Sequence, residues 1–160
     1  MKNVAEEGRE QADVGRASRR TPPRGVTVEL GRRYQFAASH RLHTDKLSEE
    51  ENRRVFGKCS NPYGHGHNYK LEISLAGEID ESTGMIANLA DLDVFVEREI
   101  LEPFDYKSLN EDVAAFRDVV PTTENLCMEI YRRLSRFPGA RLKRVRIQET
   151  SNNSFEYTGH

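Results

Sequence analysis

Apolar and polar residues alternate along two stretches in the first half of the chain. In the first stretch the even positions carry Val26, Val28, Leu30, Tyr34, Phe36, Ala38 and His40. In the second stretch the odd positions carry His65, His67, Tyr69, Leu71, Ile73 and Leu75. An alternation with a period of two predicts strands that bury one face. Arg32 breaks the first row, which leaves a bend or bulge near Gly31 open.

Two later stretches have the spacing of amphipathic helices. Asn88 can cap the first, whose apolar residues fall on one side: Leu89, Leu92, Val96 and Ile100. Pro121 and Thr122 open the second, whose shared face is Leu126, Cys127, Ile130 and Leu134. Pro138-Gly139 is expected to end this helix. Cys127 is therefore predicted to be a small core residue that takes part in no reaction.

Alternation returns near the carboxyl end, where Val145, Ile147 and Glu149 share one strand face and Phe155 and Tyr157 alternate in a final segment. Glu149 ends an apolar row, where an unpaired carboxylate would be costly. Two interpretations stay open at this point. The carboxylate pairs with a buried arginine or with backbone donors, or it accepts two hydrogen bonds from the planar, guanidine-like edge of a ligand.

The predicted elements follow the order strand, long loop, strand, helix, helix, strand, strand. The loop over residues 44–64 is expected to hold a short helix, because Ser48 followed by Glu51 is a capping-box signature. Residues 80–84, with the sequence Asp-Glu-Ser-Thr-Gly, form a turn cluster that ends the second strand.

Each histidine of the two rows stands at the end of a strand that faces the core. His65 and His67 point to the same side, because side-chain direction repeats every two residues in a strand. If the two strands pair antiparallel, the ring of His40 converges on them. Zinc held by three protein ligands keeps its fourth position open, as in catalytic sites. The alternative is a set of hydrogen-bonded core histidines, and the three registers favour zinc. Cys59 lies near enough in sequence to line the site without necessarily ligating the metal.

Length and composition set broad bounds. A chain of 160 residues suits one domain. Its net charge of −2 is spread along the chain, so we expect neither a nucleic-acid nor a membrane partner. No apolar run approaches the ~20 residues that span a bilayer, and the amino terminus has no hydrophobic signal core. The two cysteines are expected to be free thiols in a reducing compartment, which predicts a cytoplasmic protein.

The first 25 residues differ from the rest of the chain. They hold six basic and four acidic residues and almost no large apolar side chains. Such a segment buries too little surface to offset the entropy of ordering, so we predict a disordered tail over residues 1–25 and a single catalytic domain over residues 26–160. A transit peptide is the alternative, and the acidic residues count against it.

A dense set of short motifs then carries a resemblance. The motifs are Ala38-Ser39-His40-Arg41-Leu42-His43, Phe56-Gly57-Lys58-Cys59-Ser60-Asn61-Pro62, residues 64–69, Gly77-Glu78-Ile79-Asp80, Asn88-Leu89-Ala90-Asp91-Leu92, Thr122-Thr123-Glu124-Asn125 and Glu149-Thr150. With them the chain resembles the 6-pyruvoyl-tetrahydropterin synthase family. Five residues separate Cys59 from His65, a spacing that resembles the pyruvoyl-forming branch rather than the 6-carboxytetrahydropterin synthases.

The resemblance implies an α+β tunnelling fold (T-fold), with a four-stranded antiparallel sheet and two helices on one face. Three subunits would join their sheets into a barrel, and two trimers would stack into a homohexamer. Ring closure removes unpaired sheet edges. Active sites in this family lie between subunits.

The resemblance also implies a reaction. Zinc on His40, His65 and His67 would assist a carbon–oxygen lyase that converts 7,8-dihydroneopterin triphosphate to 6-pyruvoyl-tetrahydropterin and triphosphate in tetrahydrobiopterin formation. Cys59 would act as general base, and nearby zinc and Lys58 are expected to favour its thiolate. Glu149 would anchor the pterin ring, supported by Thr122, Thr123 and Glu124.

One departure from the family pattern concerns proton transfer. Where the family has an Asp-His pair, this chain has Asp105-Tyr106. Asp105 keeps its expected part, whereas the phenol of Tyr106 is a poor base at neutral pH and would serve as an acid or hydrogen-bond donor. Alternatively Tyr106 fills space at a subunit interface. Two other functions stay open: an enzyme of the same scaffold that makes 6-carboxy- or 6-hydroxymethyl-pterin, and a non-catalytic oligomer that binds zinc and pterin.

Overall fold

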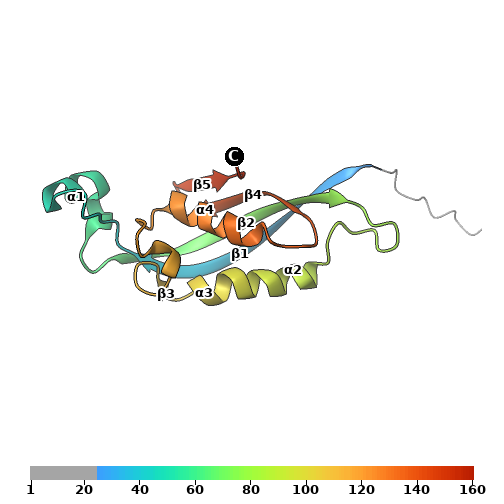
Figure 1. The fold of residues 1–160 in the computed structure, drawn as a ribbon, viewed down its shortest axis with the longest axis horizontal. Coiled ribbons are helices and arrows are strands. Elements are labelled where there is room, and N and C mark those ends of the chain that lie inside the picture. Colours follow the sequence, from blue (N-terminus) through green and yellow to red (C-terminus); the bar gives the residue numbers. More distant parts are fainter. Residues whose placement is uncertain (1–24) are drawn as a thin grey trace, which may run out of the picture.

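A computed structural model describes residues 25–160 of the chain, so the tail predicted over residues 1–25 lies, except for Gly25, outside the described residues. The long elements are strands β1 (Thr27–His40), β2 (His65–Glu78), β4 (Arg141–Gln148) and β5 (Ser154–Tyr157) and helices α1 (Glu49–Phe56), α2 (Leu89–Val96) and α4 (Thr123–Leu134). Figure 1 shows them along the chain. The shorter elements are a 3-10 helix (Gly57–Ser60), a π-helix (Glu97–Leu101), α3 (Glu102–Phe104), β3 (Lys107–Ser108) and a second 3-10 helix (Ala114–Phe116).

One sheet holds the strands in the order β3-β1-β2-β4-β5. The four longer strands pair antiparallel, as the resemblance implied, and β3 adds a fifth strand that pairs parallel with β1. Only Ala38 and Ser39 of β1 have partners in β3. A two-residue strand is too short to show alternation, which is why the sequence did not reveal it.

The pairing of β1 with β2 runs from Thr27 to His40 without a shift of register. The bulge allowed near Gly31 is therefore absent, and the irregularity of the sheet lies instead between Ser74 and Leu75, where β2 pairs with β4. The side chain of Arg32 keeps its place in the row because it donates two hydrogen bonds, of 3.1 and 2.6 Å, to the carboxylate of Asp93 in α2.

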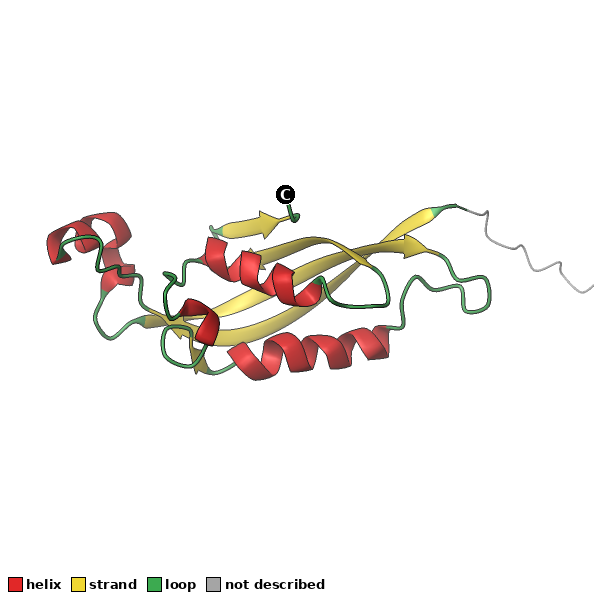
Figure 2. Cartoon of the chain, viewed as in Figure 1, coloured by secondary structure: helices red, strands yellow, loops and turns green. Residues whose placement is uncertain are grey.

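The helices pack on one face of the sheet, and Figure 2 shows α2 and α4 on the same side of the strands. Asn88 and Thr122 cap them as predicted, accepting hydrogen bonds from Ala90 N and Asn125 N. The core joins strand rows and helix faces: Phe36, Tyr69, Leu71, Ile73, Leu75, Leu92, Val96, Ile100, Leu126, Cys127, Ile130, Leu134, Val145 and Ile147 are all buried. The face of the sheet turned away from these helices is called the open face below.

Three expectations about the elements need correction. Val26 and Val28 belong to the apolar row of β1 but are 41% and 39% exposed, so burial on this strand begins nearer the histidine end. Leu89 is also 38% exposed. Helix α4 ends at Leu134, ahead of Pro138-Gly139, because the chain turns there, with Phe137 N donating to Leu134 O at 3.0 Å, and buries the Phe137 ring.

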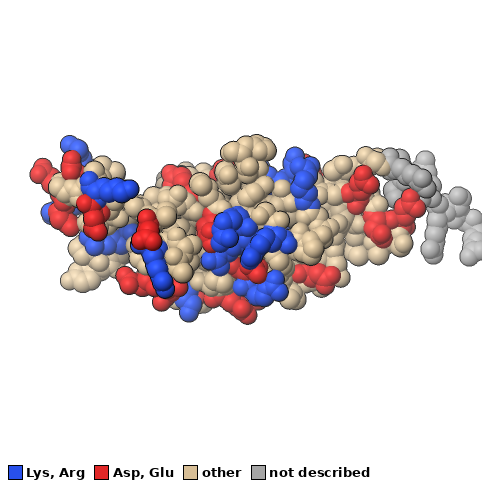
Figure 3. Space-filling model, viewed as in Figure 1, with Lys and Arg blue, Asp and Glu red and all other residues tan. Residues whose placement is uncertain are grey.

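The capping box predicted in the long loop is present. Ser48 and Glu51 exchange reciprocal hydrogen bonds at the start of α1. On the face in view in Figure 3, acidic and basic side chains are interspersed. Within residues 25–160, none of the helices combines the length and the apolar character needed to cross a bilayer.

A candidate metal centre beside a pocket

The strand ends bring three histidines together, as their registers predicted. His40 of β1 pairs directly with His65 of β2, and Ala38 pairs with His67. The ring centroids lie 4.8 Å apart for His40 and His65, 5.1 Å for His40 and His67, and 4.7 Å for His65 and His67. We call His40, His65 and His67 the histidine cluster.

A backbone carbonyl fixes the ring of His40. Its Nδ1 lies 2.9 Å from the carbonyl oxygen of Pro121. Since a carbonyl only accepts, Nδ1 carries the proton and Nε2 presents its lone pair to the cluster, 3.3 Å from His65 Nε2. Burial lowers the pKa of His40 and of His67 because it disfavours the charged ring. Neutral imidazole is the form that binds a metal.

Two observations fit a cation in this cluster. His65 Nδ1 and His67 Nε2 are buried and form no hydrogen bond in the part of the chain that the structure describes. Two sets of three ligand atoms lie within 4.8 Å of one another: His40 with Cys59 and His65, and His40 with His67 and Glu149. The three histidines predicted as ligands are thus divided between two overlapping sets that share His40. Nitrogen, sulfur and oxygen donors in this mixture suit a borderline-soft divalent metal.

Cys59 is held beside the cluster by the end of β1. Its carbonyl accepts a hydrogen bond of 2.7 Å from Leu42 N, and Arg41 Nε donates to the carbonyl of Ser60 at 3.3 Å. Burial raises the pKa of the Cys59 thiol, and the Glu149 carboxylate raises it further. The protein groups alone therefore raise the pKa of Cys59, whereas the sequence led us to expect a lower pKa. Lys58 is exposed and does not offset burial and the nearby Glu149 anion.

Gly64 lets the loop re-enter the sheet beside His40. Its φ is +64°, a left-handed conformation that favours glycine. A Cβ at this position would lie 2.8 Å from the carbonyl oxygen of His40. Any other residue would therefore push the start of β2 away from β1 and separate His40 from His65.

Glu149 follows β4 directly and faces the cluster. Its Oε1 accepts a hydrogen bond of 2.5 Å from Thr123 Oγ1 and lies 3.9 Å from His40 Nε2 and 3.8 Å from His67 Nε2. The sequence left open that Glu149 pairs with a buried arginine or with backbone donors. Among the described residues its carboxylate forms no ion pair with an arginine and accepts no hydrogen bond from a backbone N–H. The interpretation of Glu149 as a ligand anchor remains a prediction.

The other proposed pterin contacts differ in position. Thr123 is buried and holds the carboxylate of Glu149. Thr122 uses its side chain to cap α4, accepting from Asn125 N at 3.3 Å. Glu124 is exposed in the first turn of the helix. Of the three, only Thr123 contacts Glu149.

A pocket of ≈ 970 Å³ opens beside the cluster, and we call it the metal pocket. Its walls come from α1, the turn that follows it, the start of β2 and the loop after β4. Cys59, His65, His67 and Glu149 all line it, whereas His40 is 2% exposed and lies behind them. Groups able to bind a metal, move a proton and accept hydrogen bonds thus face one space.

Asp105 and Tyr106 lie apart from that pocket within one chain. Asp105 Oδ1 accepts a hydrogen bond of 2.7 Å from Ala37 N. Tyr106 has a φ of +55° and an 88% exposed side chain, and its N donates to Ala37 O at 2.6 Å. Tyr106 and His67 border a separate shallow groove along β1 and β3. Tyr106 therefore fills no space inside this chain, and the roles predicted for both residues in proton transfer stay predictions.

Two groups at the site were missed from the sequence. The carbonyl of Pro121 orients His40, and a backbone oxygen leaves no residue-type signal. The hydroxyl of Tyr69 lies 3.5 Å from His40 Nδ1 in the core. The sequence placed Tyr69 in the same row as His67, which was a signal for its proximity.

Comparison with protein families decides the affiliation. The family model described as 6-pyruvoyl tetrahydropterin synthase matches residues 29–160. The chain belongs to this family. The resemblance inferred from the motifs is confirmed, and the match covers every residue of the histidine cluster, Cys59 and Glu149.

Relatives in this family include enzymes of animals. The 6-pyruvoyl tetrahydrobiopterin synthase of Homo sapiens is 48% identical over 137 residues, 85% of this chain and 94% of that protein. The one of Drosophila melanogaster is 45% identical over 132 residues, 81% of this chain and 79% of that protein. The 6-carboxy-5,6,7,8-tetrahydropterin synthase of Haemophilus influenzae is 29% identical over 121 residues, 63% of this chain and 84% of that protein.

A solved structure in the 6-pyruvoyl tetrahydropterin synthase family confirms the fold. The Caenorhabditis elegans 6-pyruvoyl tetrahydropterin synthase superposes with a TM-score of 0.79 at 39% identity, covering 84% of this chain and 97% of that one. The expected T-fold is confirmed, with β3 as an added short strand.

Proposed function

We propose that this chain is a lyase of tetrahydrobiopterin formation that converts 7,8-dihydroneopterin triphosphate to 6-pyruvoyl-tetrahydropterin and triphosphate. The observation that carries the proposal is the single pocket lined by Cys59, His65, His67 and Glu149, in a chain that belongs to this family. Relatives that bear this activity in their names match most of the chain.

The proposed metal is one zinc ion on His40, His65 and His67. This choice is supported by His65 Nδ1 and His67 Nε2, which form no hydrogen bond to a described residue, and by His40 Nε2, which carries no proton. Bound there, zinc would supply a Lewis acid to the side-chain hydroxyls of the substrate. The bond from His40 Nδ1 to Pro121 O holds the ring in the ligating tautomer, as outer partners of metal-bound histidines do.

Glu149 is the proposed pterin anchor. Thr123 holds Oε1, whereas Oε2 makes no hydrogen bond to any described residue. A carboxylate fixed in this way can accept hydrogen bonds from the two N–H groups on the guanidine-like edge of a pterin ring.

Cys59 is the proposed general base. As thiolate, Sγ would take a proton from one carbon of the substrate side chain and return it to the neighbouring carbon. This shift reduces the pterin ring while a hydroxyl-bearing carbon of the side chain becomes a carbonyl carbon, so it is an internal redox change and needs no external oxidant. Loss of a second proton, from the carbon next to the one that bears the triphosphate, would supply the electron pair of the new double bond as triphosphate leaves. Burial and Glu149 oppose thiolate formation, and a cation in the adjacent cluster would favour it.

The proposed assembly is a homohexamer of two stacked trimers. β3 covers β1 only at Ala38 and Ser39, and β5 pairs only with β4 in the described sheet. A long edge along β1 and the short outer edge of β5 are therefore open to pairing with other copies. Because sites in this family lie between subunits, we place Asp105 and the exposed Tyr106 at the pocket of a neighbouring copy. The two free cysteines fit a cytoplasmic, reducing location.

Product identification tests this function. Zinc-loaded protein is incubated with 7,8-dihydroneopterin triphosphate, and the pterins are identified by mass spectrometry. The proposal expects 6-pyruvoyl-tetrahydropterin together with free triphosphate. A 6-carboxy- or 6-hydroxymethyl-pterin would establish the alternative enzyme on the same scaffold. Bound but unchanged substrate would establish a non-catalytic pterin-binding protein.

A further inference from the structure

The open face of the sheet carries a second hollow, of ≈ 550 Å³, on the side of the strands that no helix of the described chain covers. Its polar lining comes from three adjacent strands. These residues are Arg33 and Gln35 of β1, Lys70 and Glu72 of β2, and Arg146 and Gln148 of β4. None of them belongs to the metal pocket.

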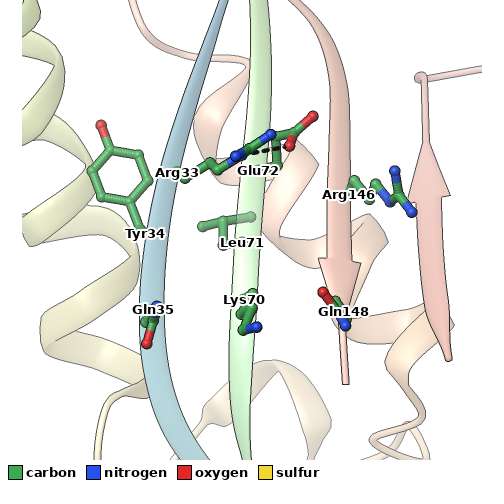
Figure 4. A pocket seen from close by; sticks show the side chains of 8 residues that line it. All are labelled: Arg33, Tyr34, Gln35, Lys70, Leu71, Glu72, Arg146 and Gln148. Carbon is green, nitrogen blue, oxygen red and sulfur yellow. Dashed lines mark hydrogen bonds and ion pairs between the residues drawn. The ribbon is translucent and has the colours of Figure 1, made fainter. Parts of the chain in front are cut away.

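Strand register arranges these side chains in two parallel rows. Lys70 pairs with Gln35 on one side and with Gln148 on the other, which gives an amide–ammonium–amide row across three strands. The next row is Arg33, Glu72 and Arg146. Figure 4 shows the two rows at successive levels of the strands. Paired residues share a face and lie on strands about 4.8 Å apart. The first row is therefore a line of hydrogen-bond donors at that spacing, whereas in the second row a carboxylate stands between two guanidinium groups.

The carboxylate in the second row is already occupied. Glu72 accepts hydrogen bonds from Arg33 Nε at 2.9 Å and from Arg144 at 2.8 Å. The bond from Arg33 is the largest of the effects that hold the pKa of Glu72 below its ordinary value, so the group is ionised at neutral pH. One carboxylate thus serves two guanidinium groups and leaves none for the other cations.

Lys70 and Arg146 form no close ion pair with a carboxylate among residues 25–160, although Glu72 faces Arg146 in register and attracts its charge. Lys70 forms no ion pair, and Arg146 donates only to the hydroxyl of Ser154 at 3.1 Å. Glu156 pairs in register with Arg146, yet its side chain lies 3.6 Å from a nitrogen of Arg144. Two exposed charges therefore face the hollow with two carboxamides beside them.

We propose that this hollow binds an inorganic oligophosphate, an anion with two or more phosphoryl groups such as tripolyphosphate. The guanidinium fork of Arg146 suits two oxygens of one phosphoryl group, and the Lys70 ammonium suits a second group as a point charge. Gln35 and Gln148 each offer amide donors along the same row. A single phosphate contacts one of the two cations and leaves the other unused. This site depends only on the strand register and on the charges of its side chains, and it is independent of the proposed reaction.

Isothermal titration of the metal-free chain with tripolyphosphate, and separately with orthophosphate, tests the proposal. The variant with Lys70→Gln and Arg146→Gln is expected to bind tripolyphosphate at least tenfold more weakly, since each lost charged hydrogen bond contributes roughly 1.5–3 kcal/mol, a factor of ten or more. Orthophosphate is expected to bind far more weakly than tripolyphosphate. Both side chains are exposed, so folding and oligomeric state should be unchanged by circular dichroism and light scattering.

A matched control removes the same two charges elsewhere. Lys46→Gln with Arg117→Gln alters one exposed lysine and one exposed arginine that line neither this hollow nor the metal pocket, and it should leave affinity at the wild-type value. Equal losses in both double variants would show unspecific attraction and overturn the proposal. Unchanged affinity of the Lys70 and Arg146 double variant would place the anion elsewhere on the protein and refute the site, and so would a wild-type protein without binding. The single variants Lys70→Gln and Arg146→Gln, each expected to bind tripolyphosphate about tenfold more weakly, repeat the test should the double variant fail to fold.

Discussion

Thr123 Oγ1 donates a hydrogen bond of 2.5 Å to Glu149 Oε1, and it joins the first turn of α4 to the residue that follows β4. The bond fixes a carboxylate that carries no guanidinium partner in the described chain and stands 3.8 Å from His67 Nε2. The start of one helix and the end of the strand that follows it thus set the distance between the proposed pterin anchor and the proposed metal site.

Glu149→Gln should weaken substrate binding about tenfold or more and leave zinc in place. Losing the charge removes a hydrogen bond of the charged class, roughly 1.5–3 kcal/mol. Calorimetry with substrate and metal analysis of the same sample measure the two effects. Because Glu149 also belongs to one of the two possible ligand sets, loss of zinc in this variant would identify it as a metal ligand instead.

Cys59→Ala should assemble, hold zinc and bind substrate, while turnover falls by a factor of ~10²–10⁴, the usual contribution of a positioned base. The matched variant is Cys127→Ala. Burial raises the pKa of Cys127 to about 12, so this thiol stays protonated and should be irrelevant to turnover. Wild-type rates for Cys59→Ala with zinc bound would assign the proton transfer to another group.

Tyr106→Phe should lower turnover without displacing zinc, because its exposed hydroxyl is proposed to donate a proton at the pocket of a neighbouring copy. Tyr106→His should raise turnover at neutral pH by supplying a stronger base. Steady-state rates across a range of pH, with products identified, compare the three proteins. A phenylalanine variant that matches the wild type throughout would leave Tyr106 with a packing role only.

The contact of Asp93 with Arg32 should make stability depend on pH. The hydrogen bond from Arg32 holds the pKa of Asp93 below its ordinary value of 3.8, so this contribution is present above pH 3.8 and is lost as the pH falls through the lower value. Asp93→Asn should therefore reduce the free energy of unfolding at pH 7. The difference from wild type should shrink toward zero in strong acid. Urea unfolding of both proteins at pH 7 and in strong acid measures this difference in the free energy of unfolding. A difference that does not change with pH would contradict the linkage.

The strands and helices were predictable where a local pattern carried them. The rows ending at His40 and His67 alternate with a period of two, and the caps at Ser48, Asn88 and Thr122 are read from side chains near in sequence. Because cross-strand register follows from the buried face, convergence of the three histidines was predictable as well.

Features set by tertiary contacts were not predictable in this way. The partner of Arg32 lies on α2, and the strand β3 is two residues long. The carbonyl of Pro121 that orients His40 has no signature in residue type. The direction of the Cys59 pKa shift depends on burial and on Glu149, which lies far along the chain.

Zinc titration of metal-free protein tests the central claim most directly, with 6-pyruvoyl-tetrahydropterin formation as the signal. Turnover should rise in proportion to added zinc and saturate at one zinc per chain. His67→Ala should remain close to zero at the same zinc concentrations, whereas His43→Ala, which alters a histidine outside the cluster, should follow the wild type. Full turnover by metal-free protein, or an unchanged titration of His67→Ala, would contradict the account.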